Sequence, residues 1–536
     1  MTNQQTVDYI IVGAGSAGCV LANRLSASGK HRVLVLEAGP EDTSRWIHIP
    51  IGYGKLFAMP EVNWMYQSEP EPQLKNRRVF TPRGKVIGGS SSINGLVYIR
   101  GQREDFDEWA RLGNVGWSFD DVLPYFKRAE DQQHGADAYH GVGGPLPVTD
   151  LPDKHELADA YIAAAGEIGI PRNDDFNGAQ QEGAGYFQST ARNGRRASCA
   201  VAYLKPARGR ANLQVMSNAQ VNRVLFEGTR AIGVSYEALG TKHTVRANKE
   251  ILLAGGSINS PQLLQLSGVG PRGLLTKHGI AVVHASPQVG EGLQDHFYAR
   301  TIWRCTKPIT FNDDMNSAVR RIGVGLKYFL ERRGPLTVSA GYAGAFVRTQ
   351  PTMTRPDVQL YFINFSTDKM GTTLHRFLGF TASVSNLRPE SRGHVRIRSA
   401  NPLQAPAIQY NYLSSENDQK SMIDGLKIVR RMMQTAAMKP YVAAEHAPGD
   451  AIRTDTDWLN YAREVGGTVY HPTTTCRMGI DDSAVVDTAL RVRGVTGLRV
   501  IDASIMPNVV SGNTNAAVIM IAEKGADLVL ADAAKP

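Results

Sequence analysis

Three glycines near the N-terminus have the spacing of a site for a dinucleotide pyrophosphate. Gly13 permits a tight turn, Gly15 lets phosphate oxygens approach the backbone, and Gly18 allows a helix to pack closely on a sheet. A helix that begins just after Gly15 would offer free N–H groups and the positive end of its dipole to the phosphates. The glycine pattern alone is a weak signal, because glycine-rich turns also occur without a ligand.

The residues around these glycines favour the nucleotide interpretation. The run Asp8–Val12 is typical of a strand, helical apolar spacing follows residue 16, and Val33–Leu36 is typical of a second strand. Glu37 comes directly after that strand, where a carboxylate can accept hydrogen bonds from ribose hydroxyls. Strand, glycine turn, helix, strand and acidic residue occur in the order that a nucleotide site requires, so we expect one here.

A candidate base lies near the other end of the chain. His471 is in the run Tyr470–Gly479, and Asn513 precedes a helical pattern at 514–530. Neutral histidine can accept a proton from a hydroxyl near pH 7. A lone histidine is more often packed in a loop, and asparagine is a common helix cap, so neither residue is diagnostic by itself. As a pair, they would act on one substrate oxygen.

Composition narrows the function classes. The 536 residues include 59 Lys and Arg and 50 Asp and Glu, a net charge of +9. These basic residues are dispersed, so we expect no nucleic acid partner and at most peripheral contact with a membrane. The four cysteines, Cys19, Cys199, Cys305 and Cys476, are far apart, which indicates neither disulfides nor a zinc site; no other metal-ligand spacing is present.

The cysteine usage fits a reducing cytoplasm. Met1–Val7 lacks the apolar core of a signal peptide, and no apolar run reaches the ~18 residues of a spanning helix. We therefore expect a cytoplasmic protein, with peripheral association with the inner membrane as the alternative.

Element patterns predict two domains. Strands are expected at 213–216, 221–226, 251–254 and 498–502, and a helix with Ser260 as its N-cap and Pro261 at its first position. Between 300 and 465, strand patterns joined by short connections favour an antiparallel sheet. These strands are expected at 341–349, 357–367, 379–388, 393–398 and 406–412, with helices near 316–332 and 417–436.

The expected fold class is α/β (α+β overall), with a Rossmann-like nucleotide domain and an inserted substrate domain built on an antiparallel sheet flanked by helices. The nucleotide domain takes residues 1–150, 190–300 and 465–536, and the substrate domain takes 151–189 and 301–464.

Two long motifs resemble signatures of the glucose–methanol–choline (GMC) oxidoreductase family. They are Gly84–Tyr98, rich in glycine and serine, and Gly256–Gly270. Val289–His296 is similar to a further family turn, with Gly292 where the family often has Asn. The resemblance covers essentially the whole chain and is strongest to bacterial choline and alkanol dehydrogenases. It implies FAD as the cofactor, bound in the nucleotide domain.

The resemblance also implies site residues, position by position. His471 matches the family's active-site histidine, and Asn513 matches its partner; His140 and His296 also occupy family-like positions, which we interpret as structural. The positions expected to bind the cofactor are Gly13, Gly15, Ser16, Ala17, Gly18, Glu37, Ala38, Trp64, Arg83, Gly88, Ser90, Asn94, Gly95, Val97, Val221, Asp502, Ala503, Asn513 and Thr514.

One departure from the family concerns how FAD is held. Some members attach FAD covalently through a histidine just before the asparagine of the glycine-rich loop, and this chain has Ile93 there. We therefore expect non-covalent FAD.

The implied activity is oxidation of a primary alcohol to an aldehyde, with His471 as base and hydride transfer to flavin N5. Choline dehydrogenase and an oxygen-using alcohol oxidase are the alternatives within this chemistry, so the electron acceptor is either a quinone-type carrier or oxygen. Hydroxynitrile lyase, which keeps FAD without net redox chemistry, and a light-driven decarboxylase are alternatives from other classes. Tyr342, Phe346, Tyr361, Phe362 and Phe365 could line a substrate pocket or belong to the core.

Overall fold

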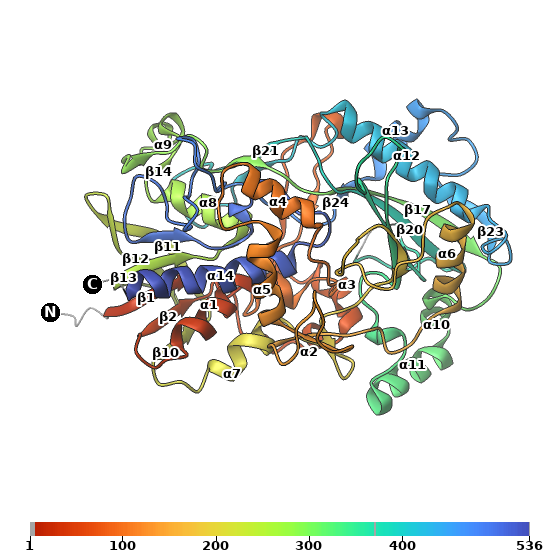
Figure 1. Cartoon of the computed structure of the whole chain (residues 1–536), viewed down its shortest axis with the longest axis horizontal. Coiled ribbons are helices and arrows are strands. Elements are labelled where there is room, and N and C mark those ends of the chain that lie inside the picture. The colour runs from red at the N-terminus through yellow and green to blue at the C-terminus, as the bar shows by residue number, and fades with distance from the viewer. Residues whose placement is uncertain (1–5, 369–370, 535–536) are drawn as a thin grey trace.

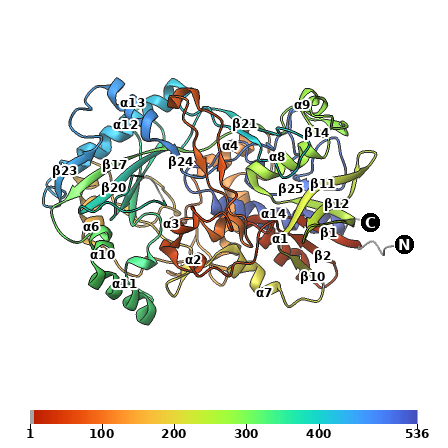
Figure 2. The same cartoon turned by 180° about the vertical axis from the view of Figure 1, so that it is seen from behind.

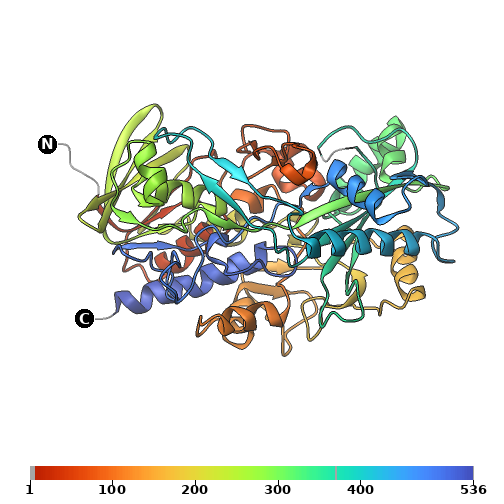
Figure 3. The ribbon, with the colours of Figure 1, turned by 90° about the horizontal axis from the view of Figure 1, so that it is seen from above.

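The computed structural model describes residues 6–368 and 371–534, which form two halves side by side along the long axis (Figures 1 and 3). Residues 1–5 of the polar N-terminal segment lie outside the described residues. Figure 2 shows the segment that carries α2 (Arg45–His48) and α3 (Tyr53–Leu56) between the two halves. In the described part of the chain, no helix combines the length and apolarity needed to cross a membrane.

The first half is built on a seven-stranded sheet with strands in the order β10-β2-β1-β13-β12-β11, and β25 pairs with β13. Its apolar centre is parallel, which is typical of strands that are buried on both faces. Those parallel strands are β1 (Thr6–Val12), β2 (Val33–Leu36), β10 (Leu213–Met216), β13 (Thr241–Leu253) and β25 (Leu498–Val500). Two antiparallel strands, β11 (Ala219–Glu227) and β12 (Arg230–Ala238), extend its edge.

Two helices pack together beside this sheet, α1 (Ser16–Ser26) and the C-terminal α14 (Asn515–Ala533). Gly18 explains the close fit of α1 on β1, because a Cβ atom at Gly18 would lie 1.9 Å from the carbonyl oxygen of Gly13. An ion pair of 2.7 Å between Arg24 and the fully buried Glu523 ties the two helices together. The fold class and the predicted C-terminal helix are confirmed.

Helix α8 (Gly256–Leu266) corrects one prediction. It starts at its Gly255 cap, so Ser260 is not the N-cap and Pro261 lies inside the helix. Proline has no N–H to donate to the carbonyl four residues earlier, which belongs to Ser257. The Thr475 hydroxyl donates to that carbonyl instead, at 2.7 Å, and this substitute partner lets the helix continue through the proline.

The second half is built on another seven-stranded sheet, in the order β23-β17-β20-β19-β18-β7, with β24 pairing with β17; its pairs are antiparallel. Helices α6 (Glu156–Glu167) and α12 (Glu416–Met433) pack against it (Figure 1). Its strands are β7 (Gly183–Tyr186), β17 (Phe297–Cys305), β18 (Ala343–Val347), β19 (Val358–Ile363), β20 (Gly379–Asn386), β23 (Val442–Ala447) and β24 (Gly467–Thr468). The domain boundary expected at residue 300 falls inside β17.

Two expected strands of this sheet belong elsewhere. β21 (Gly393–Arg396) and β22 (Ala407–Gln409) form a separate sheet with β16 (Glu291–Leu293). The Gln265 side chain on α8 explains this placement: its amide donates to the carbonyls of Val289 and Val395 at 3.0 and 2.9 Å and accepts from the Ile397 N–H at 2.8 Å. These bonds hold the segment after β20 against the first half of the molecule, hereafter the nucleotide half.

The helix expected near 316–332 is confirmed as α11 (Ala318–Glu331), and a separate short helix, α10 (Phe311–Asn316), precedes it. α10 ends before Ser317, which is the N-cap of α11. The Ser317 hydroxyl accepts a hydrogen bond from the Arg320 N–H, so a serine within the apolar pattern starts a new helix.

Candidate active site

One cavity is lined by residues from both halves of the molecule. Most of the predicted site residues line it: Gly13, Gly15, Ser16, Ala17, Glu37, Ala38, Trp64, Arg83, Ser90, Asn94, Gly95, Val97, Val221, His471, Asp502, Ala503, Asn513 and Thr514. Gly18 and Gly88 are the two predicted positions that do not line it. Gly18 lets α1 pack closely on β1. Gly88 takes a φ of +90° in a turn, and its own N–H donates to the Ala14 carbonyl at 2.7 Å.

Two glycine turns face each other at the nucleotide end of the cavity. A Cβ atom on Gly89 would lie 2.6 Å from the Cα of Gly15, and one on Gly13 would lie 2.7 Å from the Ala254 carbonyl oxygen. The backbones therefore approach one another too closely at these positions for side chains to fit. This side-chain-free cradle beside the N-terminus of α1 fits a pyrophosphate, as FAD requires.

Glu37 closes the same end. Its carboxylate accepts hydrogen bonds from the N–H groups of Ala14 at 2.8 Å and Gly39 at 2.9 Å. Burial outweighs these bonds and raises the pKa of Glu37 to about 7. The carboxylate therefore fixes both the glycine turn and the segment after β2.

Loop 84–98 forms one wall of the cavity and is held in place, in keeping with its apolar residues. Arg83 donates to the Tyr470 carbonyl at 2.8 Å, and the Asn94 amide oxygen accepts from Arg196 at 2.7 Å. Ile93 is buried against an apolar cluster that includes Tyr53 and Phe57. These contacts fix the loop as a wall of the site.

Both carboxylate oxygens of Asp502 accept hydrogen bonds from other residues of the protein. One carboxylate oxygen accepts from the Gly256 N–H at 2.8 Å and the Ser260 hydroxyl at 2.6 Å, and the other accepts from Ser504. Next to it, the N-terminus of α14 opens into the cavity at Thr514 and Asn515. The Ser16 hydroxyl donates to the Asn515 side chain at 2.7 Å, so the N-termini of α1 and α14 meet at the cavity.

His471 is buried at the junction of the two halves. Its Nε2 atom lies 3.2 Å from the amide nitrogen of Asn513, and its Nδ1 atom lies 2.9 Å from Nδ1 of His296. Its backbone N–H donates to Asp295 at 2.7 Å. The structure therefore brings together the two predicted catalytic residues and adds a second histidine behind them.

Hydrogen bonding determines which nitrogen of His471 is free. Nε2 of His296 lies 3.0 Å from the Leu387 carbonyl, which can only accept, so this nitrogen carries the proton. Burial lowers the pKa of His296 to about 4, so its Nδ1 is a bare acceptor for the N–H on Nδ1 of His471. Nε2 of His471 is then unprotonated and accepts from the Asn513 amide.

The same burial keeps His471 neutral. Burial, followed by the neighbouring His296 and the Arg83 guanidinium, holds the pKa of His471 well below its usual value. An uncharged imidazole with its lone pair toward a cavity is the state a general base needs. We interpreted His296 from sequence as structural; its position directly before β17, beside Asp295, was the available signal for its contact with His471.

Gln359 is a residue that sequence analysis missed. Its side-chain amide nitrogen lies 3.4 Å from the Asn513 amide oxygen, and it accepts the Tyr361 hydroxyl at 2.7 Å. This contact orients Asn513 with its NH₂ group toward His471. Gln359 lies in an apolar strand, β19, and could not be separated from the sheet pattern by sequence alone.

The far end of the cavity is formed by the second sheet. Its residues are Tyr298, Arg300, Tyr361, Ile363, Phe365, Thr367, Thr381 and Ser383. Of the aromatic candidates, Tyr361 and Phe365 line the cavity, while Tyr342, Phe346 and Phe362 are buried in core clusters. Among the described residues, the only carboxylates lining the cavity are Glu37 and Asp502, both held in the nucleotide half.

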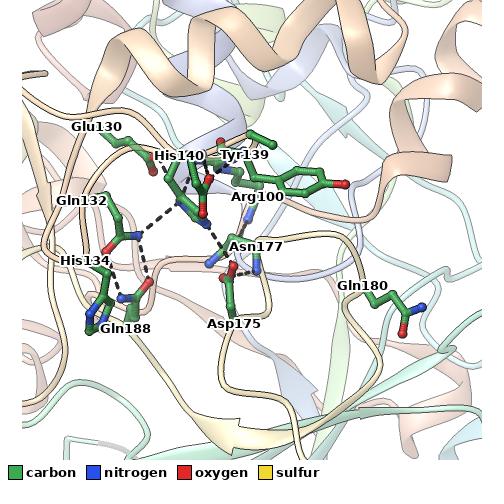
Figure 4. A network of polar contacts seen from close by, with 12 residues as sticks. Arg100, Glu130, Gln132, His134, Tyr139, His140, Asp175, Asn177, Gln180 and Gln188 are labelled. Atoms are coloured by element: carbon green, nitrogen blue, oxygen red, sulfur yellow. Dashed lines mark hydrogen bonds and ion pairs between the residues drawn. The ribbon is translucent and has the colours of Figure 1, made fainter.

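A second histidine cluster lies outside this cavity (Figure 4). His140 contacts Glu130 and Asp175, each at 3.0 Å, and Arg100 pairs with Glu130 at 2.5 Å. Burial alone lowers the pKa of His140, but the bonds to Asp175 and Glu130 outweigh it and raise the pKa to about 9. The cluster joins the segments around residues 100, 140 and 175, which supports the structural role we expect for His140.

A dinucleotide cradle joined to a buried neutral histidine is the arrangement of a nucleotide-dependent oxidoreductase. The particular family is shown by sequence comparison: the N-terminal GMC oxidoreductase model matches residues 7–298 and the C-terminal model matches 389–522. The chain belongs to the GMC oxidoreductase family, which places it among the FAD-dependent oxidoreductases.

Relatives and solved structures agree with this family. The chain is 44% identical to an alcohol dehydrogenase (acceptor) of Pseudomonas putida, over 98% of this chain and 95% of the relative. It is 43% identical to an oxygen-dependent choline dehydrogenase of Vibrio vulnificus, over 98% and 95%. A crystal structure of pyridoxine 4-oxidase from Mesorbium loti is similar with a TM-score of 0.88 and 31% identity, over 97% and 98% of the two chains.

Proposed function

We propose that this protein oxidises a neutral primary alcohol to an aldehyde, using FAD bound without a covalent link. The observation that carries the proposal is the unprotonated Nε2 of His471, fixed by His296 and facing Asn513 at 3.2 Å in the cavity. When bound in the glycine cradle, FAD supplies the acceptor for the hydride that leaves the alcohol carbon. All of its predicted binding residues except Gly18 and Gly88 line the cavity.

The residues around the reacting oxygen have separate roles. His471 Nε2 takes the hydroxyl proton, and the Asn513 NH₂ group donates to the same oxygen and orients it. Burial between the two halves excludes water from the imidazole, which keeps it neutral and available as a base. Arg83 adds positive charge near the site, which favours an alkoxide over a free hydroxyl.

The charge of the far end favours a neutral alcohol over choline. A quaternary ammonium group is stabilised by carboxylates or an aromatic cage. Here the charged side chain is Arg300, which donates to the Asp368 carbonyl. Aromatic side chains at this end would suit an ammonium group or an apolar alcohol, so the positive charge of Arg300 decides against choline. The choline dehydrogenases among the relatives keep choline as the alternative substrate.

We infer non-covalent attachment from the wall around Ile93. Covalent flavin links need a nucleophilic side chain, and Ile93 has none. None of the four cysteines lines the cavity, and His471 is the one histidine among its described lining residues. Acid precipitation should release the yellow colour to the supernatant; a yellow pellet would contradict the proposal.

The electron acceptor we propose is a quinone-type carrier rather than oxygen. Its support is the name of the Pseudomonas putida relative, an alcohol dehydrogenase (acceptor), which does not name oxygen. The oxygen-dependent choline dehydrogenase of Vibrio vulnificus keeps oxygen as the alternative acceptor. A cytoplasmic location stays a prediction.

Anaerobic titration tests the activity directly. Purified yellow protein is mixed in the dark with butan-1-ol, hexan-1-ol, benzyl alcohol and choline while flavin absorbance is recorded. We expect neutral alcohols to bleach the flavin faster than choline, and the colour to return slowly when air is admitted. Rapid recovery in air would identify an oxidase. Protein that retains FAD but is bleached by no alcohol would support the lyase or decarboxylase alternative.

A further inference from the structure

Helix α11 projects an unusual surface into solvent. Of its 14 residues, only Val324 and Tyr328 are buried. Five large apolar side chains of the helix are exposed by half or more: Val319 at 80%, Ile322 at 63%, Leu326 at 54%, Phe329 at 72% and Leu330 at 73%. Figure 1 shows α11 beside α10 at the lower right edge of the molecule, outside the second sheet.

The exposed apolar residues share one face of the helix. At 3.6 residues per turn, positions 319, 322, 326, 329 and 330 project within an arc of about 100°, on the side opposite Val324 and Tyr328. The helix therefore has two apolar stripes on opposite sides. One narrow stripe packs on the protein, and a wider apolar stripe faces outward, where a helix of a protein surrounded only by water would carry polar residues.

Basic side chains lie on the two flanks of the helix, between the outward apolar stripe and the buried one. Residues 318–333 contain five basic residues, Arg320, Arg321, Lys327, Arg332 and Arg333, and one acidic residue, Glu331. Arg320 and Arg321 are exposed. Arg320 donates to the Pro308 carbonyl, and its charge also acts on the Asp314 carboxyl of α10, with which it forms no ion pair. Lys327 and Arg333 pair with Asp153 at 3.7 and 2.7 Å, so the cations available to a partner are those at the start of the helix and Arg332.

This combination is that of an interfacial helix. An outward apolar stripe flanked by cations buries its apolar side among acyl chains while arginines meet anionic headgroups. A second protein would also accept an apolar stripe, but arginines on both sides of one convex helix match the negative surface of a bilayer better than a groove. We propose that α11 docks this protein on membranes that contain anionic lipids.

The position of α11 connects docking with the cavity. Val324 packs in one cluster with Phe311, Ile363 and Phe365, and the last two line the far end of the cavity. A docked α11 therefore holds that end of the site close to the bilayer. Residues 299–388, which include α11, lie between the segments matched by the two family models.

Vesicle co-sedimentation of the FAD-loaded protein tests the proposal without depending on its activity. The probes are vesicles of phosphatidylcholine alone and of phosphatidylcholine with 30% phosphatidylglycerol. We expect binding to the anionic vesicles, weakened by salt, and a loss of about tenfold or more in I322S/L326S/F329S. The matched control is V142S/L239S/L403S, which removes exposed apolar side chains, 53%, 95% and 67% exposed, elsewhere on the surface and should bind as the parent does.

Charge reversal separates the electrostatic part. R320E/R321E should lower binding to anionic vesicles about tenfold and leave weak binding to neutral vesicles unchanged, whereas R223E/R431E, at exposed arginines elsewhere, should have little effect. Oxidation of a water-soluble alcohol by each variant shows that the fold is intact. Equal vesicle binding by parent and serine variant, or none by the parent, would overturn the proposal. So would concentration-dependent self-association that the serine variant abolishes, because α11 would then join two copies of the chain.

Discussion

His296 sets the tautomer of His471 through a single contact of 2.9 Å between their Nδ1 atoms. Nε2 of His296 donates its N–H to the Leu387 carbonyl, so the unprotonated Nδ1 of His296 can only accept a hydrogen bond from His471. Removing that acceptor should leave His471 free to rotate or to carry its proton on Nε2, where it cannot act as a base. We expect His296→Leu to lower kcat/KM about 100-fold while FAD content stays unchanged.

The conservative variant separates this role from simple packing. In His296→Asn, a side-chain oxygen can again accept from Nδ1 of His471, so part of the activity should return. His394→Leu, at a half-buried histidine on β21, is the matched control and should keep kcat/KM within about twofold. Equal losses in both His296 variants would show that the residue contributes volume rather than an acceptor.

Asn513 is expected to act on the substrate oxygen through its NH₂ group. Asn513→Ala removes that donor and should lower kcat/KM about 10- to 100-fold with little change in FAD binding. Asn513→Asp would place a carboxylate 3.2 Å from Nε2, which stabilises the imidazolium and raises the pKa of His471. Activity of the Asp variant should therefore fall at low pH and recover partly at high pH. A pH-independent loss in that variant would contradict this role.

The pH dependence of the unmodified enzyme follows from the lowered pKa of His471. A base loses activity only when the pH falls below its own pKa, and burial holds this pKa well below the usual 6.5. We therefore expect kcat/KM to show no inflection near pH 6.5 and to stay level down to the acid limit of the fold. Steady-state rates with a neutral alcohol and a dye acceptor, measured from pH 5.5 to 9, check this. An acid limb centred at 6.5 would mean either that the pKa of His471 is not lowered or that protonation of Glu37, whose pKa is about 7, limits the reaction.

Local patterns were sufficient where function depends on neighbours in sequence. The order of strand, Gly13–Gly18 turn and helix identified the nucleotide end, because each glycine has a local steric reason. Contacts between distant segments could not be predicted in this way. Gln265 moves β21 and β22 out of the expected sheet, and Thr475 lets α8 run through Pro261. His296 belonged to the same class: its role depends on a partner 175 residues away.

Arg300 provides a test of substrate charge. It lies on β17 at the far end of the cavity, and its positive charge opposes a quaternary ammonium substrate. Arg300→Glu should shift the ratio of kcat/KM for choline over butan-1-ol at least about tenfold toward choline. Arg304→Glu, an exposed arginine on the same strand that does not line the cavity, is the control and should leave the ratio unchanged. An unchanged ratio in Arg300→Glu would remove Arg300 from substrate selection.

The His140 cluster predicts a pH-dependent contribution to stability. The pKa of His140 is raised to about 9 in the folded protein, above the ~6.5 of an unfolded histidine. Its charged form therefore stabilises the fold fully below pH 6.5, and this contribution is lost as the pH rises through 9. His140→Gln should lower the free energy of unfolding by about 3 kcal/mol at pH 6. The deficit should shrink markedly by pH 9.5.

Urea unfolding of the FAD-loaded protein at pH 6, 7.5 and 9.5 measures this deficit. His134→Gln is the matched control, because His134 forms a similar 3.1 Å pair with Asp150 but its side chain is 63% exposed. Solvent screens such a pair, so the control should change stability by less than about 0.5 kcal/mol at every pH. A deficit in His140→Gln that is as large at pH 9.5 as at pH 6 would mean that His140 contributes through packing and neutral hydrogen bonds, and that its charge does not stabilise the cluster.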